Sequence, residues 1–81
     1  MQYRIEIDKR AVKFICKQPK QQRERLLRAI YKLPDGDIRQ MKGYTNYYRL
    51  RVGDYRVIYT LNNDILLIRV IEVGNRGDVY K

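Results

Sequence analysis

The sequence contains no histidine and only one cysteine, Cys16. One cysteine cannot form a disulfide within the chain, and a chain without histidine lacks both the commonest metal ligand and the commonest general acid–base. A zinc site and a Ser–His–Asp hydrolase are therefore set aside, and we expect neither a metal ion nor a cofactor. We expect Cys16 to be a small buried hydrophobic residue.

Acidic residues are also scarce, since 18 Lys and Arg face 9 Asp and Glu and give a net charge of +9. Like charges repel on a compact surface, so this excess favours a polyanion or an acidic protein as partner. The alternative is a merely soluble surface, although solubility needs only ~2–8 net charges. The first eight residues alternate and carry charges, unlike a signal peptide or a membrane span. We expect a cytoplasmic protein without a membrane partner.

Periodicity predicts the N-terminal half as one strand followed by two helices. Residues 2–7 alternate between apolar and polar side chains, which is typical of a half-buried strand. Asp8 can cap a first helix that continues to Cys16, and Pro19 is placed to open a second. Apolar residues then recur at helical spacing and predict a core-facing stripe, namely Leu26, Ala29, Ile30 and Leu33. Residues 34–37 and 42–46 are expected to be turn and loop.

Three further strands are expected at about 47–52, 55–61 and 65–73. Gly53-Asp54 forms a two-residue hairpin loop, and Gly74-Asn75 is expected to end the last strand. The last strand is apolar on nearly every residue and should lie inside the sheet. Residues 1–81 are therefore predicted to form a single α+β domain with the order β-α-α-β-β-β. Its two N-terminal helices pack on one face of a mainly antiparallel, four-stranded twisted sheet.

The hairpin loop fixes which side chains share a face. Arg51 must oppose Arg56, and Arg49 must oppose Ile58. One face is then a core face and carries Tyr48, Leu50, Val52, Tyr55, Val57 and Tyr59. The other face carries Tyr47, Arg49, Arg51, Arg56, Ile58 and Thr60.

The opposed arginines indicate a phosphate site. Like charges directly opposite each other destabilise a sheet by some tenths of a kcal/mol, whereas a bound phosphate turns the same cluster into a source of affinity. The alternative is that the arginines extend into solvent and their pairing is harmless. Beyond the last strand, the tail that holds Arg76 and Tyr80 can fold back along this face. Tyr80 and Tyr47 are candidates for base stacking, or are tyrosines that only pack.

Three segments carry a family resemblance: Lys42-Gly43, the run from Tyr48 to Tyr59, and the run from Val73 to Tyr80. Together they resemble the RelE/ParE toxin superfamily over essentially the whole chain. RelE-type members are toxins of type II toxin–antitoxin pairs. They cut mRNA in the ribosomal A site by making a 2′-hydroxyl attack the neighbouring phosphate.

The resemblance implies roles for particular residues and partners. The family's functional positions fall on Arg49, Arg51, Arg56, Arg76 and Tyr80. Arg51, Arg56 and Arg76 would bind the scissile phosphate, Arg49 the backbone, and Tyr80 would orient the nucleotide and assist proton transfer. Lys42 and Tyr47 are further candidates for RNA contact. The implied partners are an acidic antitoxin, mRNA and the ribosome, with operator DNA reached only through the antitoxin complex.

The sequence departs from the family pattern at Arg49 and Arg51, which are lysines in the best-known RelE. Arginine stays protonated and is a poor general base, so an identified general base is missing, and Tyr80 and solvent on the substrate side remain as candidates for proton transfer. Two alternatives stay open: a ParE-like, non-catalytic toxin that inhibits DNA gyrase, and a nucleic-acid-binding module without toxicity.

Overall fold

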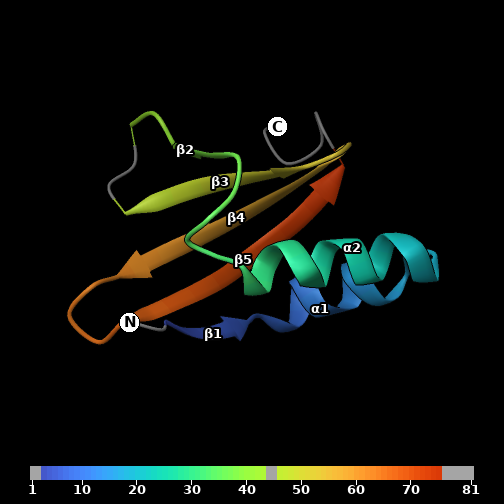
Figure 1. The fold of residues 1–81 in the computed structure, drawn as a ribbon, viewed down its shortest axis with the longest axis horizontal. Coiled ribbons are helices and arrows are strands. Elements are labelled where there is room, and N and C mark those ends of the chain that lie inside the picture. Colours follow the sequence, from blue (N-terminus) through green and yellow to red (C-terminus); the bar gives the residue numbers. More distant parts are fainter. Residues whose placement is uncertain (1–2, 44–45, 76–81) are drawn as a thin grey trace.

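The computed structural model describes residues 3–43 and 46–75. In this part of the chain the elements follow one another as β1 (Arg4–Ile7), α1 (Lys9–Cys16), α2 (Lys20–Tyr31), β2 (Ile38–Gln40), β3 (Tyr47–Val52), β4 (Tyr55–Asn62) and β5 (Leu67–Asn75) (Figure 1). The two helices and three long C-terminal strands confirm the predicted α+β class. No helix in the described ranges is long and apolar enough to cross a membrane.

The sheet has five strands, so the predicted number of four is wrong. It is mainly antiparallel, as predicted, but mixed, because β1 and β5 pair in parallel. Its strand order is β1-β5-β4-β3-β2. β1 lies parallel to β5. Parallel strands cannot be joined by a tight hairpin, and here two helices and three strands lie between them in the sequence. The additional strand is β2, which pairs antiparallel with β3 within a segment expected to be mostly turn and loop. β5 lies between β1 and β4, as its apolar sequence predicted.

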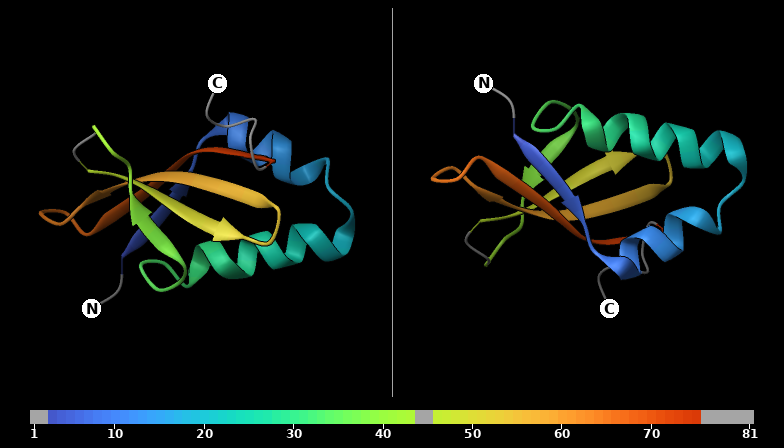
Figure 2. Two further views of the ribbon diagram at one scale, coloured as in Figure 1. Left: turned by 90° about the horizontal axis from the view of Figure 1, so that it is seen from above. Right: turned by 90° about the horizontal axis from the view of Figure 1, so that it is seen from below.

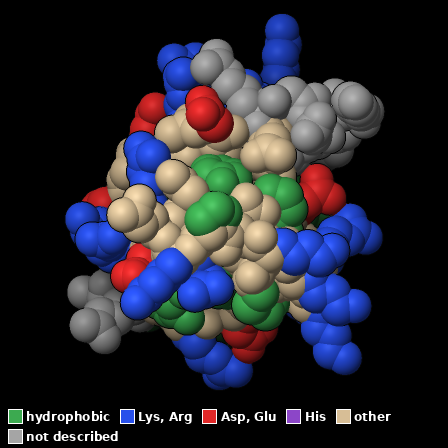
Figure 3. Space-filling model, turned by 90° about the vertical axis from the view of Figure 1, so that its right-hand side faces the viewer, with side chains coloured by type: hydrophobic (Ala, Val, Ile, Leu, Met, Phe, Trp, Pro, Cys, Tyr) green, Lys and Arg blue, Asp and Glu red, His purple; other side chains and the backbone are tan. Residues whose placement is uncertain are grey.

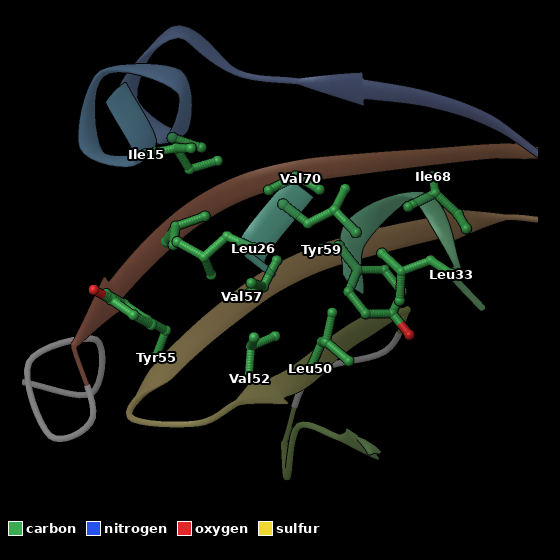
Figure 4. Close-up of a cluster of buried hydrophobic side chains, with 13 residues drawn as sticks. Ile15, Leu26, Leu33, Leu50, Val52, Tyr55, Val57, Tyr59, Ile68 and Val70 are labelled. Atoms are coloured by element: carbon green, nitrogen blue, oxygen red, sulfur yellow. The ribbon is translucent and has the colours of Figure 1, made fainter. Parts of the chain in front are cut away.

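Both helices pack on one face of the sheet, as predicted (Figure 2). Ala11, Ile15, Leu26 and Ile30 from the helices form one buried cluster with strand residues such as Val57. Figure 4 shows the ring of Tyr59 pointing from β4 toward Leu33 and Leu50, deep in this cluster. The hairpin residues assigned to the core face are mostly buried there, with Tyr48 packed at the margin.

Cys16 is exposed at the end of α1, so the expectation that it is buried is wrong. It follows Ile15, which faces the sheet and is 3% exposed. Adjacent residues of a helix point in directions about 100° apart, and the neighbour of a core residue can therefore face solvent.

Asp8 stands at the start of α1, but its side chain makes no capping hydrogen bond. Its Oδ1 instead accepts a hydrogen bond from Nε of Arg69 at 2.9 Å. This hydrogen bond and the negative charge of Asp8 raise the pKa of Arg69. Asp8 therefore ties the β1–α1 junction to β5 and does not close the helix end as the sequence predicted.

The ends of β5 also differ from the prediction. The turn after β4 extends to Leu66, whose φ is +51°, and Asn62 Oδ1 accepts hydrogen bonds from the N–H groups of Asp64 and Ile65. The strand therefore begins at Leu67 and not at residue 65. At its other end Gly74 pairs with Arg56, so Gly74-Asn75 continues the strand that it was expected to end.

The β3–β4 hairpin has the predicted two-residue loop and register. Gly53 adopts φ +58°, and an added Cβ would lie 2.8 Å from an Nη atom of Arg25 on α2. At the start of β4 the hydroxyl of Tyr55 donates to Gln18 Oε1 at 2.9 Å. These contacts hold the hairpin against the helices and so fix the position of the arginines that it carries on its opposite face.

Candidate nucleic-acid interface

Arginines occupy neighbouring cross-strand positions on the sheet face opposite the helices. Arg51 of β3 pairs directly with Arg56 of β4, as predicted. One step along the sheet, Arg49 pairs with Arg39 of β2 on one side and with Ile58 of β4 on the other. Directly paired residues share a face, and alternate residues of a strand do too. The four guanidinium groups therefore start from one side of three adjacent strands.

These side chains surround a hollow of about 220 Å³, which we call the arginine hollow. Its lining residues are Asp37, Arg39, Arg49, Arg51 and Arg56. The structure thus brings together three of the residues selected from the sequence: Arg49, Arg51 and Arg56. Arg76 and Tyr80, the other two, lie outside the described residues.

Two of the lining residues, Arg39 and Asp37, were missed by sequence reasoning. Arg39 lies on β2, and Asp37 comes directly before it. A strand of three residues is too short to show alternation, and the turn-forming residues before it conceal its start. The available signal was Ile38, a β-branched residue that aligns opposite Leu50 of the core.

The arginine hollow favours an anionic ligand on electrostatic grounds. The Arg51–Arg56 and Arg39–Arg49 pairs each place like charges opposite one another, which is unfavourable in the free protein. A phosphodiester replaces this repulsion by charge-assisted hydrogen bonds, and each guanidinium can bind two phosphate oxygens. Arg49 and Arg56 are half-buried, where screening by water is weaker. In the described part of the chain no cluster of cysteine or acidic side chains is placed to hold a metal ion.

A wider groove lies beside the hollow on the same face. It has a volume of about 620 Å³ and is lined by Asp8, Lys9, Arg10, Met41, Tyr47, Ile58, Ile71 and Glu72. Ile58, directly opposite Arg49, joins the groove to the hollow and is only 5% exposed. Arg10 and Glu72 form an ion pair of 3.0 Å in the groove wall. A partly apolar groove with a tyrosine next to a cationic hollow suits a nucleotide, whose base stacks on aromatic or apolar surface beside its phosphate.

The two predicted RNA-binding residues outside the arginine pairs have different positions. Tyr47, at the start of β3, lines the groove. Lys42 is exposed in the loop after β2 and lines neither the hollow nor the groove. The structure therefore places Tyr47 beside the arginines and leaves Lys42 at the periphery.

Positive charge also extends beyond this face. Another groove, of about 360 Å³, lies between α2 and the C-terminal end of β3 and is lined by Arg25, Arg28 and Lys32 among others. Figure 3 views the end of the molecule where the α1–α2 connection and the hairpin lie, and Lys and Arg side chains surround a hydrophobic centre there. A polyanion or an acidic protein can therefore contact basic side chains on more than one side of the domain.

Comparison with known proteins gives matches in the toxin family that the sequence resembles. Residues 6–80 match the family described as the ParE toxin of the type II toxin–antitoxin system parDE. Toxin RelE3 of Methanocaldococcus jannaschii is 46% identical over 44 residues, which are 54% of this chain and 48% of that protein. The chain thus spans about half the length of this relative.

Two solved structures match over nearly the whole chain. The archaeal RelE–RelB complex from Pyrococcus horikoshii OT3 gives a TM-score of 0.78 at 33% identity, covering 96% of this chain and 99% of that one. The isolated RelE toxin of E. coli gives a TM-score of 0.73 at 27% identity, covering 96% and 90%. The sequence match, the shared fold and the arginine-bearing hairpin agree, and this chain belongs to the RelE/ParE family of type II toxin–antitoxin toxins.

Proposed function

We propose that this protein is an endoribonuclease toxin that cuts mRNA, in the ribosomal A site, without a metal ion. The observation that carries the proposal is the arginine hollow with its adjoining groove on one sheet face. Four cations around a space of about 220 Å³ are suited to one phosphate, and the groove offers a place for the neighbouring base. A protein that only binds another protein has no evident need for such a combination.

The chemistry uses the RNA's own nucleophile. The 2′-hydroxyl attacks the adjacent phosphorus, and the bond from phosphorus to the 5′-oxygen of the next nucleotide breaks. Arg51 and Arg56 hold the phosphate and stabilise the negative charge that develops on its oxygens, and such stabilisation contributes about 3–4 kcal/mol per donor in well-studied enzymes. Arg49 binds the backbone. Orienting an attacking group within the same molecule corresponds to effective molarities of ~10⁵ M or more.

The tail residues complete the proposed site. Arg76 would supply a further guanidinium to the phosphate, and Tyr80 would orient the nucleotide and assist proton transfer. Both lie outside the described residues, so their roles depend on the family resemblance alone.

The proposed partners are mRNA on the ribosome and an acidic antitoxin. A net charge of +9 provides complementarity for both. The solved RelE relatives include complexes with RelB from P. horikoshii and E. coli, and the same kind of partner is proposed here. Operator DNA would be reached only through such a complex, and the site of action would be the cytoplasm.

The test is to map transcript 5′ ends after brief expression of the wild type, Arg51→Ala and Arg56→Ala. Each variant removes a phosphate contact that strengthens in the transition state, so cleavage should fall by roughly 100-fold or more. Arg4→Ala is the matched control: it removes the same charge from β1, at the opposite edge of the sheet, and should cut like the wild type. Full cleavage by both Arg51→Ala and Arg56→Ala would refute the assignment of the hollow.

The second candidate is a ParE-like toxin that inhibits DNA gyrase without catalysis, and the description of the matching family favours it. The two candidates differ in the cellular response. Cut transcripts and halted translation indicate the nuclease, whereas a DNA damage response and filamentation indicate the gyrase inhibitor.

A further inference from the structure

Among the described residues that line the arginine hollow, Asp37 is the one acidic side chain. It stands directly before β2, where its carbonyl oxygen accepts a hydrogen bond from the backbone N–H of Arg51 at 3.0 Å. This hydrogen bond continues the β2–β3 register by one position and places Asp37 opposite Arg51. Asp37, Arg51 and Arg56 therefore form one cross-strand row.

A carboxylate at this position is unexpected for a site that only binds phosphate. It repels the anion and partly cancels the positive charge that the arginines provide. Within the described part of the chain, the contact that Asp37 makes with β3 is made by its backbone, and its side chain is exposed. Its presence in the hollow is therefore better explained by a chemical role.

Apart from Tyr80, which lies outside the described residues, the proposed reaction has no group assigned to this role. The 2′-hydroxyl must lose a proton as its oxygen attacks, and a positioned base accelerates such a step by ~10²–10⁴-fold. The arginines remain protonated at neutral pH and cannot accept this proton. A carboxylate is ionised at neutral pH and can accept it.

We infer that Asp37 is the general base of this toxin, an assignment that rests on the proposed ribonuclease function. The Asp37 carboxylate takes the proton of the 2′-hydroxyl while the 2′-oxygen forms its bond to phosphorus. The bond from phosphorus to the 5′-oxygen breaks, and the 5′-oxygen takes a proton from solvent. The products are a 2′,3′-cyclic phosphate and a 5′-hydroxyl, and Asp37 returns its proton to water.

The competing explanation is that Asp37 only balances the charge of the arginines. The two explanations predict opposite effects for Asp37→Asn. If the carboxylate only balances charge, its removal strengthens RNA binding and leaves cleavage unchanged or faster. If it is the base, RNA binding is kept or strengthened while cleavage at saturating RNA falls.

The experiment measures single-turnover cleavage and RNA affinity of the full chain, with and without ribosomes, for the wild type and Asp37→Asn. Asp35→Asn is the matched control, because it removes the same charge two residues away. The Asp35 side chain lines the groove between α2 and β3 but not the arginine hollow. A third variant, Asp37→Ala, is assayed with added formate, a small carboxylate that can occupy the vacated space.

We expect Asp37→Asn to lose roughly 100-fold in cleavage rate without weaker RNA binding, and Asp35→Asn to stay within threefold of the wild type. Formate should restore part of the activity of Asp37→Ala. The inference is overturned if the wild type cuts RNA and Asp37→Asn cuts it within threefold of the same rate, or if Asp35→Asn loses as much. A wild type that cuts no RNA under either condition overturns the proposed function itself, which keeps the two failures distinct.

Discussion

Replacement of Arg39 by glutamine should stabilise the protein and weaken its binding to RNA at the same time. Arg39 is exposed on β2 and faces Arg49 directly across the strand pair. Opposed side chains in antiparallel strands have Cβ atoms roughly 5 Å apart, and two like charges at such separations repel by up to about 1 kcal/mol in water-like surroundings. Glutamine keeps most of the length and polarity of the side chain but removes the charge.

The expected gain in the free energy of unfolding is about 0.5 kcal/mol at low salt, or roughly 2–4 °C in Tm for a domain of this size. The gain should shrink in 1 M salt, where the Debye length is ~3 Å. In the same variant the slope of log K against log salt for single-stranded RNA should fall by ~0.7, as expected for one lost phosphate contact. Urea unfolding and RNA titrations, each at several salt concentrations, measure both effects.

Arg4→Gln is the matched control for net charge. Arg4 donates to Glu6 at 2.9 Å on β1, so its removal breaks an attractive pair and should cost up to about 1 kcal/mol. Changes of opposite sign in the free energy of unfolding of the two variants would support repulsion among the arginines of the hollow. A loss of stability in Arg39→Gln at low salt, or a gain that salt does not reduce, would refute the reasoning.

Two further predictions concern the core. Burial, and to a smaller degree the neighbouring Tyr48, raise the pKa of Tyr59 from the ordinary 10 to about 12. The resulting contribution to the free energy of unfolding is fully present below pH 10 and is lost as the pH rises through 12. Up to about 3 kcal/mol should disappear over this range, and Tyr59→Phe should show a correspondingly flatter decline in urea unfolding; identical declines in the two proteins would contradict the stated cause. Leu26 is 0% exposed, and Leu26→Ala should cost about 2–5 kcal/mol through lost contacts and the cavity left behind. A loss below about 1 kcal/mol would show that the site between α2 and the sheet collapses to fill the space.

The hairpin could be predicted closely from the sequence because its loop fixes the pairing register of β3 and β4. Once Gly53 and Asp54 form a two-residue loop, each pair along β3 and β4 follows by counting, and the period of two assigns every side chain to a face. Arg51 and Arg56 were therefore placed opposite one another correctly. The apolar stripe of α2 was also predictable, because Leu26 and Ile30 repeat at the helical period.

The sheet's outer parts were not predictable in this way. β2 has three residues, which is too short for a periodic signal, and its pairing with β3 is decided by tertiary contact. Asp37 and Arg39 were missed with it. The parallel pairing of β1 with β5 joins residues more than sixty positions apart, and no local pattern encodes such a contact.

The most direct test of the central claim is whether the arginines on this face bind the same phosphodiester. An RNA with 2′-O-methyl groups lacks the attacking hydroxyl and can be titrated without being cut, while the Nε–H signals of the arginines are followed by NMR. The account predicts that the signals of Arg49, Arg51 and Arg56 shift together with one common Kd, while those of Arg4 and Arg69 do not. Signals that shift with unrelated Kd values, or shifts confined to the helices, would contradict it.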